Sequence, residues 1–128
     1  MRFFTLTQIL KMHKDIIDRT SSNSKEYAIR DIGLLQSALS TIFHSFQSKF
    51  LYPTIQEKVA RLCYGIIKNH PFIDGNKRMG LHLMLITLVI NNVHLNYTDD
   101  EMVELIMDVV TNKTSLEELT YWIFERSY

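Results

Sequence analysis

The sequence predicts an all-α protein of six helices, with a short flap before the third helix and a charged loop at the N-terminus of the fourth. Helix breakers are scarce, because the 128 residues include only four Gly and two Pro. Helix-start signals recur along the chain, whereas strand signals are weak. Apolar residues make up 46% of the chain, enough for one folded domain spanning residues 1–128.

Helix starts are marked by a repeated pattern, a hydroxyl residue followed by Glu three positions later. In this pattern, called a capping box, the two side chains each accept a hydrogen bond from a backbone N–H at the start of the helix. The pattern occurs at three pairs: Thr54 with Glu57, Thr98 with Glu101, and Ser115 with Glu118. With the apolar periodicity, these signals predict helices at residues 6–19, 32–43, 55–68, 76–91, 99–111 and 115–126.

The first two helices have weaker start signals. Thr7 is a candidate N-cap for the first helix, and Asp31 is a candidate for the second. In the first helix Ile9, Met12 and Ile16 share one face, which predicts an amphipathic helix packed on the core.

Three segments are expected outside the helices. FHSFQSKFLYPT, residues 43–54, is the best candidate for a short hairpin or flap. Residues 93–97 are expected to be extended. SSNSKEY, residues 21–27, is typical of a polar loop.

Charge and cysteine content exclude several function classes. Lys plus Arg number 14 and Asp plus Glu number 14, so the chain has no basic excess for nucleic acid. The apolar run LHLMLITLVI, residues 81–90, is about half as long as a membrane span, and no targeting segment is apparent. We therefore expect a cytoplasmic protein without direct nucleic-acid or membrane binding. The single cysteine, Cys63, cannot form an internal disulfide and is expected to be buried.

The stretch HPFIDGNKRMG, residues 70–80, places charged residues directly before that apolar run. A helix start carries unpaired backbone N–H groups and about half a positive charge, which suits phosphate. Gly75 and Asn76 mark this start, and Gly75 lets a ligand approach the backbone. Lys77 and Arg78 add cations in the first turn, where each disfavours the helix by up to about 1 kcal/mol. A local rule broken in this way is typical of a functional site.

Three further residues of the stretch complete a set for phosphate transfer. Asp74 precedes the helix, where a carboxylate beside phosphates suits Mg²⁺. His70 lies in the loop, and a neutral imidazole there can accept the proton of a hydroxyl, a role worth about 10²–10⁴-fold in rate. Phe72 is expected to be buried beneath the loop. A base, a metal ligand and a phosphate cradle on one loop predict a phosphate-group transferase.

Each of these residues also has an ordinary structural interpretation. Taken singly, His70 suits a surface position, Asp74 a helix cap, and Lys77 with Arg78 a solvated charge pair. Their joint occurrence before an apolar helix favours the functional interpretation. The aromatic and Met residues, Trp122 included, are expected in the core. No metal-ligand spacing and no functional role is expected for the remaining histidines, His13, His44, His82 and His94.

The motif HPFIDGNKR resembles the active-site motif of the Fic/Doc family, whose general form is HxFx(D/E)GNxR. IRDIGLLQSAL, residues 29–39, and LYPTIQEKVARL, residues 51–62, resemble the segments before that motif in the death-on-curing (Doc) branch. The resemblance covers residues 3–97. It implies a compact, all-helical Fic/Doc-type domain that uses ATP with Mg²⁺.

The resemblance also implies a role for each matching residue. His70 activates a hydroxyl of a target protein, and Asp74 holds Mg²⁺. Catalysis further involves Lys77 and Arg78. The flap, residues 43–52, aligns a target backbone by strand addition through Lys49, Phe50, Leu51 and Tyr52. The nucleotide-binding residues that it implies are Phe72, Gly75, Asn76, Lys77 and Arg78.

Two departures from the wider family favour the Doc branch. The AMP-transferring branch usually has Gly at the position of Lys77 and a second Arg at the position of Leu81. The resemblance to the Doc branch implies a toxin of a type II toxin–antitoxin system. Such a toxin transfers the γ-phosphate of ATP to a Ser or Thr of a target protein, for example a translation elongation factor, and arrests growth. Residues 22–26 have the spacing of the family's self-inhibitory segment but are followed by Tyr27, so control is expected from a separate antitoxin protein.

Two alternatives remain open on the sequence alone. One is an adenylyltransferase on the same scaffold, which adds AMP rather than phosphate to its target. The other is a catalytically idle member that binds a partner. The presence of His70, Asp74, Asn76 and Arg78 argues against the idle member.

Overall fold

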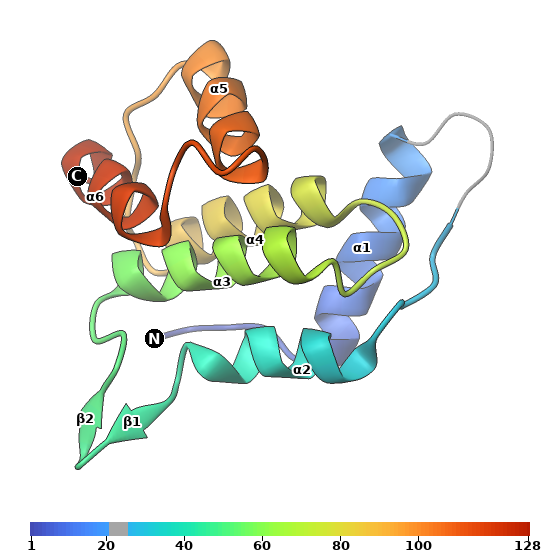
Figure 1. Cartoon of the computed structure of the whole chain (residues 1–128), viewed down its shortest axis with the longest axis horizontal. Helices are drawn as coiled ribbons and strands as arrows, with labels where there is room; N and C mark the ends of the chain where they lie inside the picture. Colours follow the sequence, from blue (N-terminus) through green and yellow to red (C-terminus); the bar gives the residue numbers. More distant parts are fainter. Residues whose placement is uncertain (21–25) are drawn as a thin grey trace.

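The structure is a computed structural model that describes residues 1–20 and 26–128. Within these residues the chain forms helices and one small hairpin, so the predicted all-α class is confirmed (Figure 1). The hairpin consists of β1 (Ser45–Phe46) and β2 (Lys49–Phe50). The six helices of the described residues are α1 (Leu6–Thr20), α2 (Ile32–Thr41), α3 (Ile55–Asn69), α4 (Asn76–Ile90), α5 (Asp99–Val110) and α6 (Leu116–Arg126).

Local capping chemistry fixes most helix starts. The capping boxes at Thr54, Thr98 and Ser115 form as predicted, with each hydroxyl and its Glu partner accepting a backbone N–H. Asp31 caps α2 by accepting the N–H of Leu34 at 3.0 Å, which confirms the prediction for the second helix.

The predicted cap of the first helix is wrong. The helix begins at Leu6, one residue before Thr7. Thr5 takes the capping role, because its hydroxyl accepts the N–H of Gln8 at 3.2 Å and the Gln8 side chain accepts the N–H of Thr5 at 2.8 Å. Thr5 and Gln8 therefore form a capping box with Gln in place of Glu.

The other helix boundaries differ from prediction by at most two residues. The largest difference is at α2, which ends at Thr41, two residues early. The carbonyl of the next residue, Ile42, accepts a hydrogen bond from Lys58 Nζ at 3.0 Å. Residues 21–25 of the predicted polar loop lie outside the described residues. Residues 26 and 27 belong to no helix or strand.

The central pair of helices is α3 and α4, which run side by side in opposite directions (Figure 1). Gly80 permits their close approach, because a Cβ at this position would lie 3.1 Å from Ile67 Cγ1 and 3.2 Å from the Cys63 carbonyl oxygen. The apolar run of residues 81–90 is helical, as predicted. Its inner face is buried at Leu83, Met84, Thr87 and Leu88, whereas five other residues are only partly buried and Val89 is exposed.

Two apolar cores lie on opposite sides of this pair. One joins it to α1 and α2, and the other joins it to α5 and α6. Cys63 is buried in the second core, where burial raises the pKa of its thiol to about 12. The members of the first core include Ile9, Leu35, Leu62, Ile66, Phe72 and Leu83. The members of the second include Val59, Met84, Ile106, Val109, Leu119 and Ile123.

The expected extended piece at residues 93–97 pairs with the C-terminus. Leu95 forms a single bridge with Ser127, and His94 and Tyr128 exchange backbone hydrogen bonds of 3.1 and 2.9 Å. The segment is extended, as predicted, although it does not form a continuous strand. Among the described residues, no helix has both the length and the apolar content that crossing a membrane requires.

The hairpin forms within the predicted segment 43–54. Its strands pair Ser45 with Phe50 and Phe46 with Lys49, and its two turn residues, 47 and 48, have φ values of 51° and 66°. Positive φ at both turn positions is the geometry of the tight turns that match strand twist. Figure 1 shows the hairpin at the N-terminal end of α3, projecting from the helices.

Candidate active site

The charged stretch forms a loop between the central helices, here called the motif loop, residues 70–75. His70 ends α3 in a left-handed conformation, with φ 49° and ψ 60°. Gly75 precedes α4 with φ 83°, a conformation that favours glycine. A Cβ at Gly75 would also lie 3.0 Å from Ile17 Cδ1, so a larger residue there would require the Ile17 side chain to shift.

The inner side of the motif loop is held by buried side chains. Phe72 is 1% exposed and stacks on His13 of α1, with ring centroids 3.8 Å apart. The Asn76 side chain accepts the N–H of Phe72 and donates to its carbonyl, both at 2.9 Å. Phe72 therefore lies beneath the loop, as predicted from the sequence. This buried position does not suit the direct nucleotide contact that was also expected of Phe72. Asn76 uses its amide to fix the loop.

A strap, residues 28–31, crosses the outer side of the motif loop. The N–H groups of Arg30 and Asp31 both donate to the Pro71 carbonyl, at 2.7 and 3.0 Å, and the N–H of Ile73 donates to Ala28. The Arg30 guanidinium also donates to the carbonyls of His70 and Asn69, each at 2.6 Å. Bonds to these two carbonyls at the end of α3 hold the backbone of His70 in place.

The motif loop and the first turn of α4 border an open pocket of about 610 Å³. The first-turn N–H groups of a helix have no partner within the helix, and α4 has no side-chain cap. The helices α3, α5 and α6 carry acidic residues in their first turns, whereas the first turn of α4 has none and contains Lys77 and Arg78. This helix start therefore favours an anion. The pocket is lined by Thr20, His70, Ile73, Asp74, Gly75, Asn76, Lys77 and Arg78.

Asp74 and Arg78 form an ion pair at the edge of the pocket. Arg78 Nη2 lies 3.0 Å from Asp74 Oδ1, and the two side chains are 32% and 45% exposed. The same carboxylate oxygen accepts the N–H of Gly75 at 2.8 Å. Arg78 also donates to the hydroxyl of Thr20 at the end of α1. The exposure leaves both charges accessible from the pocket, and such a pair contributes about 0–1 kcal/mol to stability.

His70 is exposed and lines the same pocket. Its Nδ1 lies 3.3 Å from the carbonyl oxygen of Lys68. When Nδ1 carries the proton, it donates to that oxygen, and Nε2 becomes the nitrogen that accepts a proton. The geometry therefore suits a general base.

Lys77 points across to α5. Its Nζ lies 3.7 Å from the sulfur of Met107, and the residue also lines the pocket. Leu81, one helical turn later, lies in an apolar groove with Val103 and Ile106. Position 81 therefore contributes to the contact with α5 and not to the pocket.

The donor set of the pocket fits a metal that arrives with phosphates. Asp74 is the carboxylate of the pocket lining, and no group of three or more His, Cys, Asp or Glu suited to a metal occurs among the described residues. Mg²⁺ is commonly bound by one or two carboxylates together with substrate phosphates and water. Asp74 can serve as such a ligand beside the start of α4, which favours an anion.

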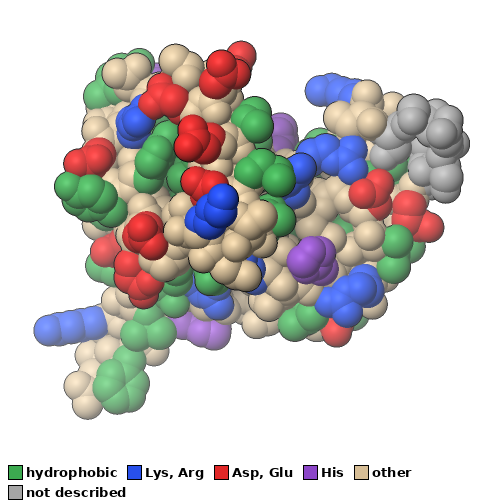
Figure 2. All heavy atoms as spheres, turned by 45° about the horizontal axis from the view of Figure 1, so that its top comes forward, with side chains coloured by type: hydrophobic (Ala, Val, Ile, Leu, Met, Phe, Trp, Pro, Cys, Tyr) green, Lys and Arg blue, Asp and Glu red, His purple; other side chains and the backbone are tan. Residues whose placement is uncertain are grey.

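Charge is distributed unevenly between the two ends of the sequence. Residues 95–128 carry eight Asp or Glu and two Lys or Arg, whereas the first 94 residues carry six and twelve. Figure 2 shows acidic side chains gathered over the part of the surface formed by α5 and α6. The motif loop belongs to the basic part of the sequence, and this positive balance favours an anionic ligand.

The flap residues are not brought beside the pocket. Lys49, Phe50, Leu51 and Tyr52 lie at the N-terminal end of α3, and the motif loop follows its C-terminal end (Figure 1). A helix of 15 residues is about 22 Å long at 1.5 Å per residue. Alignment of a target by strand addition at this hairpin stays a prediction.

Three residues at the site were missed by the sequence reasoning. His13 contacts the motif loop from α1, Thr20 lines the pocket from the same helix, and Arg30 binds the end of α3. His13 had a sequence signal, because it lies midway between Ile9 and Ile17 on the buried face of α1. A polar residue at a core position of an amphipathic helix needs an internal partner. The sequence has no comparable signal for Thr20 and Arg30.

Comparisons with known proteins agree with this fold and loop. A family model described as the Fic/DOC family matches residues 3–88. Toxin Doc of Mycolicibacterium smegmatis (strain ATCC 700084 / mc(2)155) is 30% identical over 96 residues, which cover 73% of this chain and 74% of that protein. The chain belongs to the Fic/Doc family. Its similarity to Toxin Doc assigns it to the Doc toxin branch of the family.

Proposed function

We propose that this protein is a growth-arresting toxin that transfers the γ-phosphate of ATP to a Ser or Thr hydroxyl of a target protein. The proposal is carried by the pocket of about 610 Å³ in which the exposed His70, the Asp74 carboxylate and the first turn of α4 meet. Phosphate transfer depends mainly on positioning and electrostatic stabilisation, and this loop offers both. Membership of the Doc toxin branch supports a toxin.

The residues of the pocket fit the phosphates of a nucleotide substrate. The N–H groups at the start of α4 face phosphate oxygens, and Lys77 and Arg78 supply cations beside them. Asp74 would hold Mg²⁺, which neutralises charge on the phosphate oxygens when it is bound. Gly75 leaves the backbone open to the ligand, and Asn76 keeps the loop in shape from below.

His70 is the proton acceptor of the proposed reaction. The target hydroxyl gives its proton to Nε2 while its oxygen bonds to the γ-phosphorus and the bond between that phosphorus and ADP breaks. In the proposed tautomer Nδ1 carries the proton and donates it to the Lys68 carbonyl, and Arg30 holds the backbone of His70. The left-handed conformation of His70 directs this exposed ring to the pocket rather than along α3.

Transfer of AMP is the second candidate reaction, and two positions favour phosphate transfer instead. Lys77 lines the pocket with a flexible cation where an AMP-transferring relative is expected to have Gly. Leu81 lies in the apolar groove beside α5, so no cation serves a diphosphate end from that position. The γ-phosphate is then expected to face His70 and the target hydroxyl.

Control by a separate antitoxin protein completes the proposal. The groups proposed for catalysis line one accessible pocket, so we expect the unrestrained protein to harm the cell. The expected target class is a cytoplasmic translation factor, such as an elongation factor. Expression of this protein alone should arrest growth. Co-expression of the neighbouring gene should relieve the arrest. Harmless expression of soluble wild-type protein contradicts the toxin proposal.

The chemical step is tested with ATP radiolabelled at either the γ- or the α-phosphate. The protein is incubated with each label, Mg²⁺ and a cell extract of its own organism. Wild type and His94→Ala, a control at an exposed histidine, should transfer the γ-label to a protein, and His70→Ala should not. Transfer of the α-label instead establishes AMP transfer, and labelling by His70→Ala removes His70 from the mechanism.

A further inference from the structure

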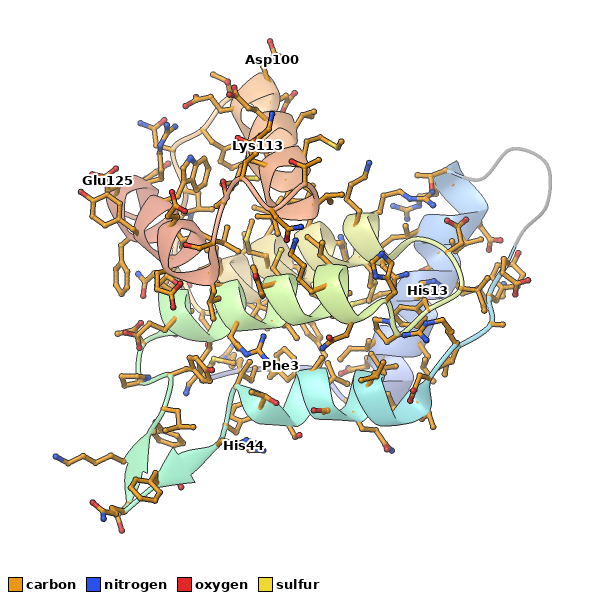
Figure 3. The ribbon with its side chains drawn as sticks, in the orientation of Figure 1. Phe3, His13, His44, Asp100, Lys113 and Glu125 are labelled. Carbon is orange, nitrogen blue, oxygen red and sulfur yellow. The ribbon has the colours of Figure 1, made fainter. Side chains whose placement is uncertain are left out.

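A buried histidine of α1 lies beneath the motif loop and has no part in the proposed proton transfer. His13 is 1% exposed, on the face of α1 that also buries Ile9 and Ile17. Figure 3 shows His13 between α1 and the segment that joins α3 to α4. A buried polar ring needs a hydrogen-bond partner, and the partner of His13 belongs to the motif loop.

His13 contacts the loop at three residues, Phe72, Asp74 and Gly75. Its ring stacks on Phe72 with an interplanar angle of 9°. Its Nε2 lies 2.8 Å from the carbonyl oxygen of Asp74. A Cβ added to Gly75 would lie 3.5 Å from the same nitrogen, so the ring also packs against the glycine that starts α4.

The hydrogen bond to Asp74 fixes the direction of a whole peptide unit. The Asp74 carbonyl and the Gly75 N–H belong to one planar trans peptide, so they point in opposite directions. The carbonyl faces His13, and the N–H faces the Asp74 carboxylate at 2.8 Å. Because Gly75 tolerates many backbone conformations, this peptide would otherwise rotate easily. Rotation would remove the N–H from the carboxylate.

His13 is suited to this contact as a neutral ring. Burial lowers its pKa, and Arg78 acts in the same direction, although the hydrogen bond and charge of Asp74 act against both. A neutral imidazole has one N–H, and the Asp74 carbonyl can only accept. The hydrogen bond therefore requires the proton to be on Nε2.

We infer that His13 is a positioning residue for the Asp74 carboxylate and the N-terminus of α4, an inference that rests on the proposed transfer reaction only for its effect on rate. The imidazole N–H holds the Asp74 carbonyl inward, the opposite edge of that peptide holds the carboxylate, and the ring supports Phe72. Loss of the N–H leaves the core filled but frees the peptide between Asp74 and Gly75.

Two variants separate the hydrogen bond from the packing. His13→Phe keeps an aromatic ring against Phe72 but has no N–H. His13→Gln keeps a neutral side-chain N–H donor. His94→Phe, at an exposed position, is the matched control. In the transfer assay His13→Phe should lower kcat about 10–100-fold with little change in the KM for the target protein, and His13→Gln should recover much of the loss.

Two readouts do not depend on transfer activity. Nitrogen NMR of the wild-type protein should find the His13 proton on Nε2. Hydrogen exchange of the Gly75 amide should be about tenfold faster in His13→Phe, as the loss of one hydrogen bond allows, and near the wild-type rate in His13→Gln. Exchange in the hairpin should be the same in all variants.

The outcomes separate this inference from the proposed function. A proton on Nδ1, or unchanged Gly75 exchange in His13→Phe, overturns the inference even if the wild type transfers phosphate. Faster Gly75 exchange in His13→Phe with recovery in His13→Gln supports it even if the wild type transfers nothing. If His13→Phe does not fold, the position of the wild-type proton and the Gly75 exchange of His13→Gln decide.

Discussion

The motif loop and the hairpin are short non-helical segments at opposite ends of α3, and they are held in different ways. The motif loop is bound by the strap, by His13 and by the Asn76 amide, with Phe72 fully buried beneath it. The hairpin has strands of two residues, and its Phe46 and Phe50 are 66% and 55% exposed. Its base is fastened mainly by Lys58, which donates to the carbonyls of Ile42 and Tyr52.

This difference matches two different tasks. Groups that position reactants must keep their geometry, and buried hydrogen bonds to the backbone provide that in the motif loop. Exposed aromatic residues on a lightly fastened hairpin suit contact with another protein. We therefore expect changes in the motif loop to affect the chemistry and changes in the hairpin to affect mainly the hairpin itself.

The largest effect is expected for His70→Ala. Loss of a general base should lower transfer by about 10²–10⁴-fold, whereas the thermal midpoint should change little because His70 is exposed. His70→Asn is a second variant that tolerates the left-handed backbone. Transfer assays and thermal melting measure the two properties. A fold that melts early in both variants means that His70 serves the structure rather than the chemistry.

Gly75→Ala should destabilise the protein by about 1–2 kcal/mol, because its left-handed φ disfavours a Cβ. The nearby Ile17 adds a steric cost at 3.0 Å. Gly65→Ala is the matched control within α3. Its Cβ would meet only ordinary contacts, with Arg61 and with Ala38 of α2, so the change should be neutral or stabilise by up to about 1 kcal/mol. Urea denaturation measures the free energy of unfolding of both variants. Equal stability of the two variants contradicts a strained loop start.

Lys58→Met should loosen the hairpin and cost about 1 kcal/mol, the usual net loss for a hydrogen bond. The amide of Leu51, which donates to His44 at 3.0 Å, should exchange faster, and the amide of Ile73 in the motif loop should not. Lys49→Met is the control on the exposed strand. If amide exchange becomes faster to the same extent at Leu51 and Ile73, the hairpin and the motif loop do not open independently.

Acid should weaken the region of the motif loop through His13. Its folded pKa is lowered, chiefly by burial, so between that pKa and about 6.5 the unfolded chain binds more protons. The contribution of His13 to the free energy of unfolding is complete above about pH 6.5. It is lost as the pH falls, by no more than about 1.4 kcal/mol per pH unit. Urea denaturation from pH 7.5 to 5 should be less pH-dependent in His13→Gln than in wild type. The control His44→Gln, beside the hairpin, should show the same pH dependence of stability as the wild type. A wild type that becomes more stable in acid contradicts the expected direction of this pH dependence.

Much of the fold could be predicted because its signals are local. A capping box is complete within four residues, so Thr54, Thr98 and Ser115 were found correctly. The error at Thr7 arose where two threonines lie close together and the true partner of Thr5 is Gln8. The end of α2 has no comparable local signal, and the partner of the Ile42 carbonyl, Lys58, is distant in sequence.

The candidate site was predictable where its residues share one stretch. His70 and Asp74 were read from the motif and do line one pocket. His13 and Arg30 were not, because their contacts exist only after α1 and the strap pack against the loop. The inward direction of the Asn76 amide was also not predicted, although its partner, the Phe72 backbone, lies only four residues away. The nucleotide, the metal, the single-domain organisation and the target contact of the hairpin stay predictions.

The measurement that tests the central claim most directly is mass spectrometry of the labelled target. The protein that receives radiolabel from wild type is purified, and its modified residue is identified alongside samples treated with His70→Ala and His94→Ala. The account predicts a single phosphate on a Ser or Thr, present with wild type and His94→Ala and absent with His70→Ala. An AMP group on the target, or the same phosphate with His70→Ala, contradicts it.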